Sequence, residues 1–188
     1  MLISDAMSAG VNPGGLQSRT EIRVLICYLL QYSKVPVPLE RVKERLHFDG
    51  IANYFEVAFA ISDLEEGGNI GVAYEENGLK FYIATGDCKN ITEALGNNVP
   101  LTIRERTMKI SEEIIQRIKN ERDNKVLIEK CDNGYYITCS VMEGQREMVS
   151  VKLLVPDDES AQIVKDNFYK NPVQVLINAT EGLTGTKL

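Results

Sequence analysis

Residues 53–83 read NYFEVAFAISDLEEGGNIGVAYEENGLKFYI, and this stretch decides the fold of the N-terminal half of the chain. Asn53 is a residue type favoured immediately before a helix, and Val57, Ile61 and Leu64 then recur at the spacing of one helical face. The first half of the stretch therefore predicts a helix with a buried apolar side.

The second half of the stretch predicts a β-hairpin, because Asn77-Gly78 separates two segments in which apolar and polar residues alternate. Asn-Gly suits the two-residue turns that match the twist of paired strands. The loop predicts three cross-strand pairs, which are Tyr74 with Phe81, Val72 with Ile83, and Glu75 with Lys80.

Two helices are predicted before this stretch and a short one after it. Ser18 and Glu21 have the spacing of a capping box ahead of an apolar run to Tyr32. Pro38 suits the first turn of a short second helix, and Asn90 begins another capping box. Three helices followed by a hairpin are the order of a winged helix-turn-helix.

The C-terminal half predicts a long helix over about residues 101–120, three antiparallel strands within 125–155, and two helices. Two helices on one face of a small sheet are the simplest packing for these elements, so the fold class is α+β. The predicted divisions are a mobile tail at 1–17, a winged-helix domain at 18–98, a linker and dimer helix at 99–122, and a β-β-β-α-α domain at 123–188.

Composition excludes several classes of function. The 188 residues carry 21 Lys and Arg against 27 Asp and Glu, so the net charge is −6 and bulk positive charge cannot drive nucleic-acid binding. His47 is the single histidine, which leaves no basis for a catalytic triad or a histidine metal site. Glycine-rich phosphate loops are also absent from the sequence. The sequence therefore predicts a protein that is not an enzyme and holds no cofactor or metal.

The cysteines are predicted to be reduced and structural, because none has CxxC spacing. In the C-terminal sheet, an Asn133-Gly134 loop would place Cys131 opposite Tyr136 and Cys139 opposite Ile128, so these two thiols would not pair. The next loop would align Cys139 with Val149 and Ile137 with Val151. The four cysteines are Cys27, Cys88, Cys131 and Cys139.

Duplex DNA is one predicted partner. The third helix of a winged helix usually enters the major groove, but residues 54–66 contain no Lys or Arg. Phosphate contacts would then come from the outer side of the second helix and from the hairpin, with base contacts at the start of the third helix. The predicted DNA-binding residues are Arg41, Lys43, Arg45, Asn53, Tyr54 and Lys80.

A protein partner is the alternative. If Val57, Ile61 and Leu64 are buried, Phe59 points partly outward, and an exposed aromatic ring favours a protein partner over phosphate. The long helix carries more apolar surface than one small module covers. Ile114 and Ile118 on that helix therefore predict contact between the two copies of a homodimer.

The chain resembles an uncharacterised bacterial family that is classed as a domain of unknown function and predicted to hold winged-helix transcriptional regulators. The resemblance covers about residues 18–183, and the order and spacing of its motifs carry it. It implies DNA binding and supplies no catalytic residues. The motifs are Leu29-Leu30, Pro38-Leu39, Asn53-Tyr54-Phe55, Leu64-Glu65-Glu66-Gly67, Val99-Pro100, Tyr135-Tyr136-Ile137-Thr138-Cys139 and Leu153-Leu154-Val155-Pro156.

Two functions follow from the sequence. The first is a dimeric, DNA-binding transcriptional regulator whose C-terminal module serves dimerisation or senses a small molecule. The second is a winged-helix adaptor that binds protein and not DNA. No apolar run reaches the ~18–20 residues needed to cross a bilayer, and no secretory signal precedes residue 18. A cytoplasmic protein without a membrane partner is therefore expected.

Overall fold

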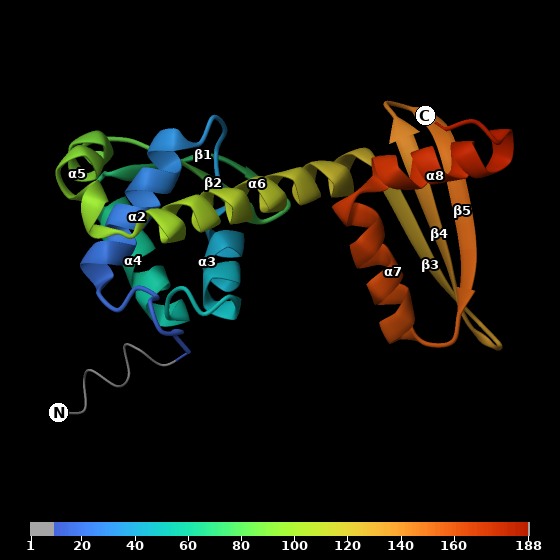
Figure 1. Ribbon diagram of the computed structural model, residues 1–188, viewed down its shortest axis with the longest axis horizontal. Coiled ribbons are helices and arrows are strands. Elements are labelled where there is room, and N and C mark those ends of the chain that lie inside the picture. Colours follow the sequence, from blue (N-terminus) through green and yellow to red (C-terminus); the bar gives the residue numbers. More distant parts are fainter. Residues whose placement is uncertain (1–9, 188) are drawn as a thin grey trace. The chain divides into compact units, whose positions relative to one another are not determined.

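The computed structural model describes residues 10–187, which hold seven α-helices, a two-stranded sheet and a three-stranded sheet, both antiparallel (Figure 1). The mixed α+β class is thus confirmed. The elements are α2 (Arg19–Tyr32), α3 (Leu39–Phe48), α4 (Tyr54–Glu66), β1 (Ile70–Glu76), β2 (Leu79–Ala84), α5 (Cys88–Leu95), the 3₁₀ turn η1 (Gly96–Asn98), α6 (Leu101–Asp123), β3 (Lys125–Cys131), β4 (Gly134–Glu143), β5 (Arg146–Val155), α7 (Asp158–Lys170) and α8 (Pro172–Thr184).

The chain forms two compact units, and the division between Ile115 and Gln116 lies inside α6. This division assigns the first part of α6 to the first unit and the last part to the second, whereas the predicted boundaries lie at residues 98 and 122. Residues 1–9 of the predicted tail lie outside the described residues. Residues 10–17 are held by the first unit, since Leu16 is buried and its N–H donates to the carbonyl of Ile51.

The first unit is built around α2, which packs against α4, α5 and β2. Leu25 and Cys27 of α2 are fully buried in a core that also takes side chains from every other helix of the unit. Val37, between α2 and α3, forms an antiparallel bridge with Tyr82 of β2. This bridge ties the chain that enters α3 to the β1–β2 hairpin.

Two of the three predicted helix caps are confirmed. Ser18 accepts from the Glu21 N–H while its own N–H donates to the Glu21 carboxylate, and Asn53 accepts from the N–H groups of Phe55 and Glu56. The cap at Asn90 is wrong, because α5 begins two residues earlier, at Cys88.

Asn53→Ala is expected to lower the free energy of unfolding of the first unit by about 1 kcal/mol, since two N–H groups of α4 lose their acceptor. Asn90→Ala is the matched control. Its amide donates to the exposed Asp87 side chain and caps no helix, so a change within about 0.5 kcal/mol is expected. Urea unfolding measures both. Equal losses for the two variants would contradict the observed start of α5.

The β1–β2 hairpin turns at Asn77-Gly78 as predicted, and Tyr74 pairs with Phe81. The Glu75–Lys80 pair is also confirmed. The third predicted pair is wrong: a bulge between Val72 and Tyr74 shifts the register, so Val72 lies opposite Tyr82.

The second unit holds the sheet β3-β4-β5, with α7 and α8 on one face of it (Figure 1). Its strand pairing differs from the predicted register. Both loops have two residues between the strands, and a bulge between Val141 and Met142 shifts the register of β4 with β5. Cys139 therefore lies opposite Val126 and Val151. Cys131 pairs with Gly134, at the start of β4. The predicted partner of Ile137 is wrong as well, because Ile137 lies opposite Ile128 and Leu153.

The core of the second unit is separate from that of the first. Ile137 is fully buried under Phe168 and Tyr169 of α7. The last turn of α6 belongs to this unit, because the Asn120 side-chain amide donates to the Tyr169 carbonyl at 2.9 Å. The Asn171 side chain caps α8 by accepting from the Gln174 N–H, Pro172 is the first residue of the helix, and α8 ends at Thr184.

In the part of the chain that the structure describes, no helix combines the length and the apolar character needed to cross a membrane.

Candidate binding interface on the first unit

The outward side of α4 is aromatic. Phe55 is 67% exposed and Phe59, one turn later, is 51% exposed. Ser62 and Glu66 continue the same side at helical spacing, and both are exposed. We call Phe55, Phe59, Ser62 and Glu66 the α4 face. It offers apolar area without a cationic side chain.

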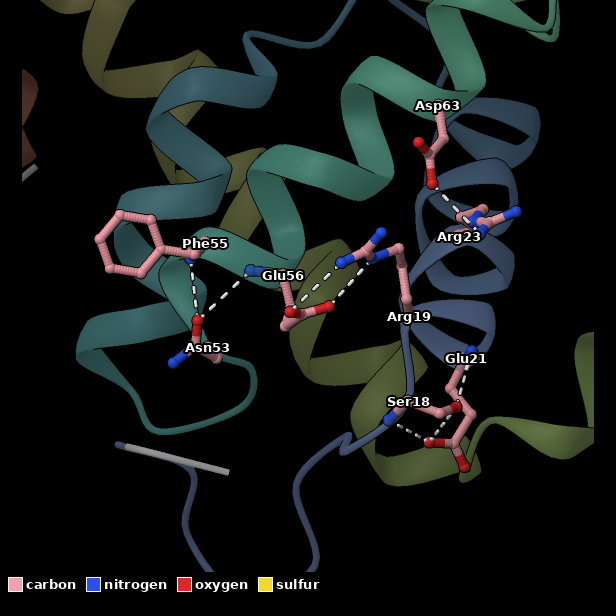
Figure 2. Close-up of polar contacts among 8 residues, drawn as sticks. All are labelled: Ser18, Arg19, Glu21, Arg23, Asn53, Phe55, Glu56 and Asp63. Carbon is pink, nitrogen blue, oxygen red and sulfur yellow. Dashed lines mark hydrogen bonds and ion pairs between the residues drawn. The ribbon is translucent and has the colours of Figure 1, made fainter. Parts of the chain in front are cut away.

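The cations of α2 that lie beside α4 are bound to carboxylates. Arg19 Nε lies 3.0 Å from a carboxylate oxygen of Glu56, and Arg23 lies 3.1 Å from Asp63 (Figure 2). The hydrogen bond to Glu56 raises the pKa of Arg19 above its ordinary value. The Glu56 carboxylate accepts two hydrogen bonds from Arg19, which belongs to a different helix.

Arg19 also stabilises the position of Phe59. Its guanidinium carbon lies 4.8 Å from the centre of the Phe59 ring, within the range of a cation–π contact. One side of the ring is therefore held by α2 while the other remains open. This contact holds an aromatic side chain in place at the surface.

An open pocket of about 500 Å³ adjoins the α4 face at Phe55. Tyr54 stands edge-on to both Phe55 and His47, with ring centres 5.6 and 6.0 Å apart. A pocket beside a fixed aromatic ridge is a common arrangement where one protein receives a side chain of another. The residues that line the pocket are Gly10, His47, Asn53, Tyr54 and Phe55.

The predicted phosphate contacts on α3 are occupied by carboxylates. Arg41 is exposed and lies 3.4 Å from Glu44. Arg45 lies 3.2 Å from Asp49 and 3.9 Å from Glu113 of α6. A phosphate group would have to compete with these carboxylates for each cation.

The predicted exposure of Lys43 on the outer side of α3 is wrong, because its side chain lies inside the unit. Its side chain is buried, forms an ion pair with Glu40, and places its ammonium 4.3 Å from the centre of the Tyr54 ring. Desolvation lowers the pKa of Lys43, but hydrogen bonds with Glu40 and Tyr54 outweigh it and raise the pKa overall. Lys43 therefore supports the packing of α3 on Tyr54.

Lys43→Ala is expected to lower the free energy of unfolding by about 1–3 kcal/mol, because it removes a buried stem, an ion pair and a cation–π contact. Arg41→Ala is the matched control on the same helix, with an expected change within about 0.5 kcal/mol. Urea unfolding at pH 7 compares them. Equal and small losses would mean that the Lys43 side chain is in solvent.

The other predicted DNA-binding residues lie on two elements, with Asn53 and Tyr54 together at the start of α4 and Lys80 on β2. Asn53 is buried and serves as the cap of α4, while Tyr54 lies under Lys43. Lys80 is exposed on β2, in the strand register opposite Glu75. Lys80 is thus placed on the hairpin, and Asn53 and Tyr54 at the start of α4.

The two predicted dimer contacts differ in their surroundings. Ile114 is half-buried and packs against the core of the first unit. Ile118, which belongs to the second unit, is also half-buried. The apolar side of α6 is therefore covered in part by its own chain.

The first unit carries a net negative charge. By sequence, residues 1–115 carry 11 Lys and Arg against 16 Asp and Glu, a net charge of −5. Among the residues that the structure describes, no group of three His, Cys, Asp or Glu side chains could hold a metal ion.

Sequence reasoning found Phe59 but missed Phe55, although the spacing of four residues between them was visible. It could not predict that Arg19 binds Glu56 or that Arg23 binds Asp63. The two residues of each pair lie on different helices and are 37 or more positions apart in sequence.

A family model described as "Domain of unknown function (DUF4364)" matches residues 22–182. No curated protein and no solved structure matches the chain significantly.

Proposed function

The chain belongs to the family described as a domain of unknown function (DUF4364), and from its surface we propose that it is a non-enzymatic adaptor that binds a protein partner through the α4 face. One observation carries the proposal. Phe55 and Phe59 are exposed side by side on a helix that has no cation, on a unit of net charge −5. Exposed aromatic rings mark protein interfaces, whereas phosphate binding requires cations.

We propose a winged helix-turn-helix for the first unit, with α4 as the third helix and β1–β2 as the wing. The order α2, α3, α4 and then a hairpin supports this assignment. In such a fold the third helix is the element that contacts the partner. The adaptor would use the same helix with aromatic side chains in place of cationic ones.

The α4 face also indicates the chemistry of the partner. Phe55 and Phe59 supply the apolar centre, and the pocket beside Phe55 accepts one apolar side chain. Glu66 lies at the far end of the face, with Glu65 next to it in sequence. A partner with an apolar ridge and a basic rim would complement this surface.

DNA-binding transcriptional regulation is the second candidate, and it is favoured by the helix order and by the exposed positions of Arg41 and Lys80. In this form the protein would contact phosphate with α3 and the hairpin. It would have to break the ion pair of Arg41 with Glu44 to do so. The adaptor requires no such exchange, and this difference is why it ranks first.

The second unit would serve dimerisation or sense a small apolar molecule, in a cytoplasmic homodimer. An open cavity of about 270 Å³ supports the sensing role. It lies between the sheet and the helices α7 and α8, and its lining is apolar except for Asn167. The lining residues are Cys139, Val151, Leu153, Val164, Asn167, Phe168 and Val175.

Site-specific photo-crosslinking in cells tests the adaptor against the regulator. A benzophenone amino acid replaces Ser62, which lies on the α4 face and leaves both phenylalanines in place. The matched control replaces Lys89, an exposed residue of α5. The expected result is a discrete protein adduct from position 62 that is absent from position 89. A nucleic-acid adduct at position 62, or the same proteins at both positions, would overturn the adaptor.

A gel shift with random-sequence duplex DNA over a salt series complements this test. The adaptor predicts no binding that weakens with salt. The regulator predicts that neutralising Arg41, Lys43 and Arg45 together lowers the log–log slope of affinity against salt, by about 0.9 for each phosphate that the variant no longer neutralises. Because Lys43 is buried, the double variant Arg41→Gln with Arg45→Gln is the informative one.

A further inference from the structure

Two cysteines that are far apart in sequence meet in the core of the first unit. Cys27 lies in α2 and Cys88 is the first residue of α5, and their sulfur atoms lie 3.0 Å apart. Both side chains are almost completely buried, and both are free thiols. Two sulfurs at hydrogen-bond distance need little movement to form a bond between them.

The two thiols are chemically unequal. The hydrogen bond with Cys27 lowers the pKa of Cys88 more than burial raises it, and the backbone of Thr85 adds to the lowering. The same hydrogen bond and the burial of its own thiol raise the pKa of Cys27. Cys88 is also the first residue of α5, where the free N–H groups of a helix favour a thiolate, and Cys27 is placed to react with whatever forms on Cys88.

We propose that Cys27 and Cys88 are a redox-active dithiol, which hydrogen peroxide oxidises to an intramolecular disulfide and a thiol reductant restores. The Cys88 thiolate attacks one peroxide oxygen, the O–O bond breaks, and the second oxygen leaves as hydroxide, which is protonated to water. Cys88 is then a sulfenic acid. The Cys27 sulfur attacks the Cys88 sulfur, the S–O bond breaks, and a second water leaves.

Two electrons pass from the two thiols to one peroxide molecule, and both thiol protons end in water. The disulfide would close a loop from residue 27 to residue 88, which contains α3, α4, β1 and β2. The whole α4 face therefore lies within the closed loop. Oxidation would stabilise the first unit by restricting its unfolded chain, and the melting temperature of that unit should rise by on the order of 10 °C.

The other two cysteines are an internal control. Cys139 is buried in the sheet and Cys131 is half-buried at the end of β3, and their strand partners differ. Within the described residues, no hydrogen bond joins these two sulfurs. They should remain alkylatable after the protein is unfolded, whatever happens to Cys27 and Cys88.

The experiment treats the full chain with hydrogen peroxide, unfolds it, alkylates it and digests it with trypsin without a reductant. The expected product joins the peptide of residues 24–34 to the peptide of residues 81–89, with a mass two hydrogens below the sum of the free peptides. Dithiothreitol should separate them. The double variant Cys131→Ser with Cys139→Ser should still form this product and show the rise in melting temperature, and Cys88→Ala should show neither.

Several outcomes would overturn the proposal. They are full alkylation of both cysteines after peroxide treatment, oxidation of Cys88 to a sulfinic acid without a link, and a link that involves Cys131 or Cys139. If Cys88→Ala does not fold, the peptide map of the Cys131→Ser, Cys139→Ser variant decides by itself, because only Cys27 and Cys88 remain in it. None of these results depends on the partner of the α4 face.

Discussion

Phe59→Glu is expected to weaken binding of the proposed protein partner by about 30- to 100-fold while the first unit stays folded. The ring is 51% exposed and lies at the centre of the α4 face, where aromatic side chains contribute most to affinity. A carboxylate there would be buried against the apolar part of the partner. Within its own chain it would face the Arg19 guanidinium, so the fold should tolerate it.

The measurement is the yield of the photo-adduct from position 62, followed by the dissociation constant of the partner identified there. Phe48→Glu is the matched control, because Phe48 is 84% exposed on α3 and is not part of the α4 face. Circular dichroism confirms that both variants are folded. Loss of the adduct in both variants, or in neither, would remove the α4 face from the proposed function.

Leu25→Ala is expected to lower the free energy of unfolding of the first unit by about 3–4 kcal/mol and to leave the second unit unchanged. Leu25 is fully buried in the core around α2, and its removal leaves a cavity. Ile137→Ala should do the reverse, with a similar loss in the second unit only, since Ile137 is fully buried in the separate core of the sheet.

Scanning calorimetry measures both transitions in one experiment. Each substitution should shift one transition to lower temperature and leave the other in place, because the two cores share no buried side chain. If either substitution shifts both transitions together, the two units unfold as one. Leu25→Ile serves as the conservative control and should cost about 1 kcal/mol.

The sequence predicted short-range features well. Ser18 and Asn53 were recognised as caps because the side chain that accepts and the N–H that donates lie within three residues. The Asn77-Gly78 turn followed in the same way. Asn90 has the same pattern, but the cap predicted there is wrong, because α5 already begins at Cys88.

Strand register was predicted less well, because a bulge, or a loop displaced by one residue, changes every strand pair beyond it. The bulge at Val72 moved its partner from Ile83 to Tyr82. In the second unit, a loop that begins one residue earlier than predicted moved every later pair. Turn residues identify that a hairpin exists, but backbone hydrogen bonds decide where the pairing starts.

The sequence by itself determined the helices, the hairpins and the aromatic spacing of α4, since each depends on residues within one or two turns of each other. Only the tertiary structure decided which charged side chains are exposed to solvent and could contact a partner. Spacing placed Lys43 outside, but packing against Tyr54 buried it. The tertiary structure also placed Cys27 beside Cys88. Such contacts depend on how separate helices pack, and no local pattern along the chain encodes that.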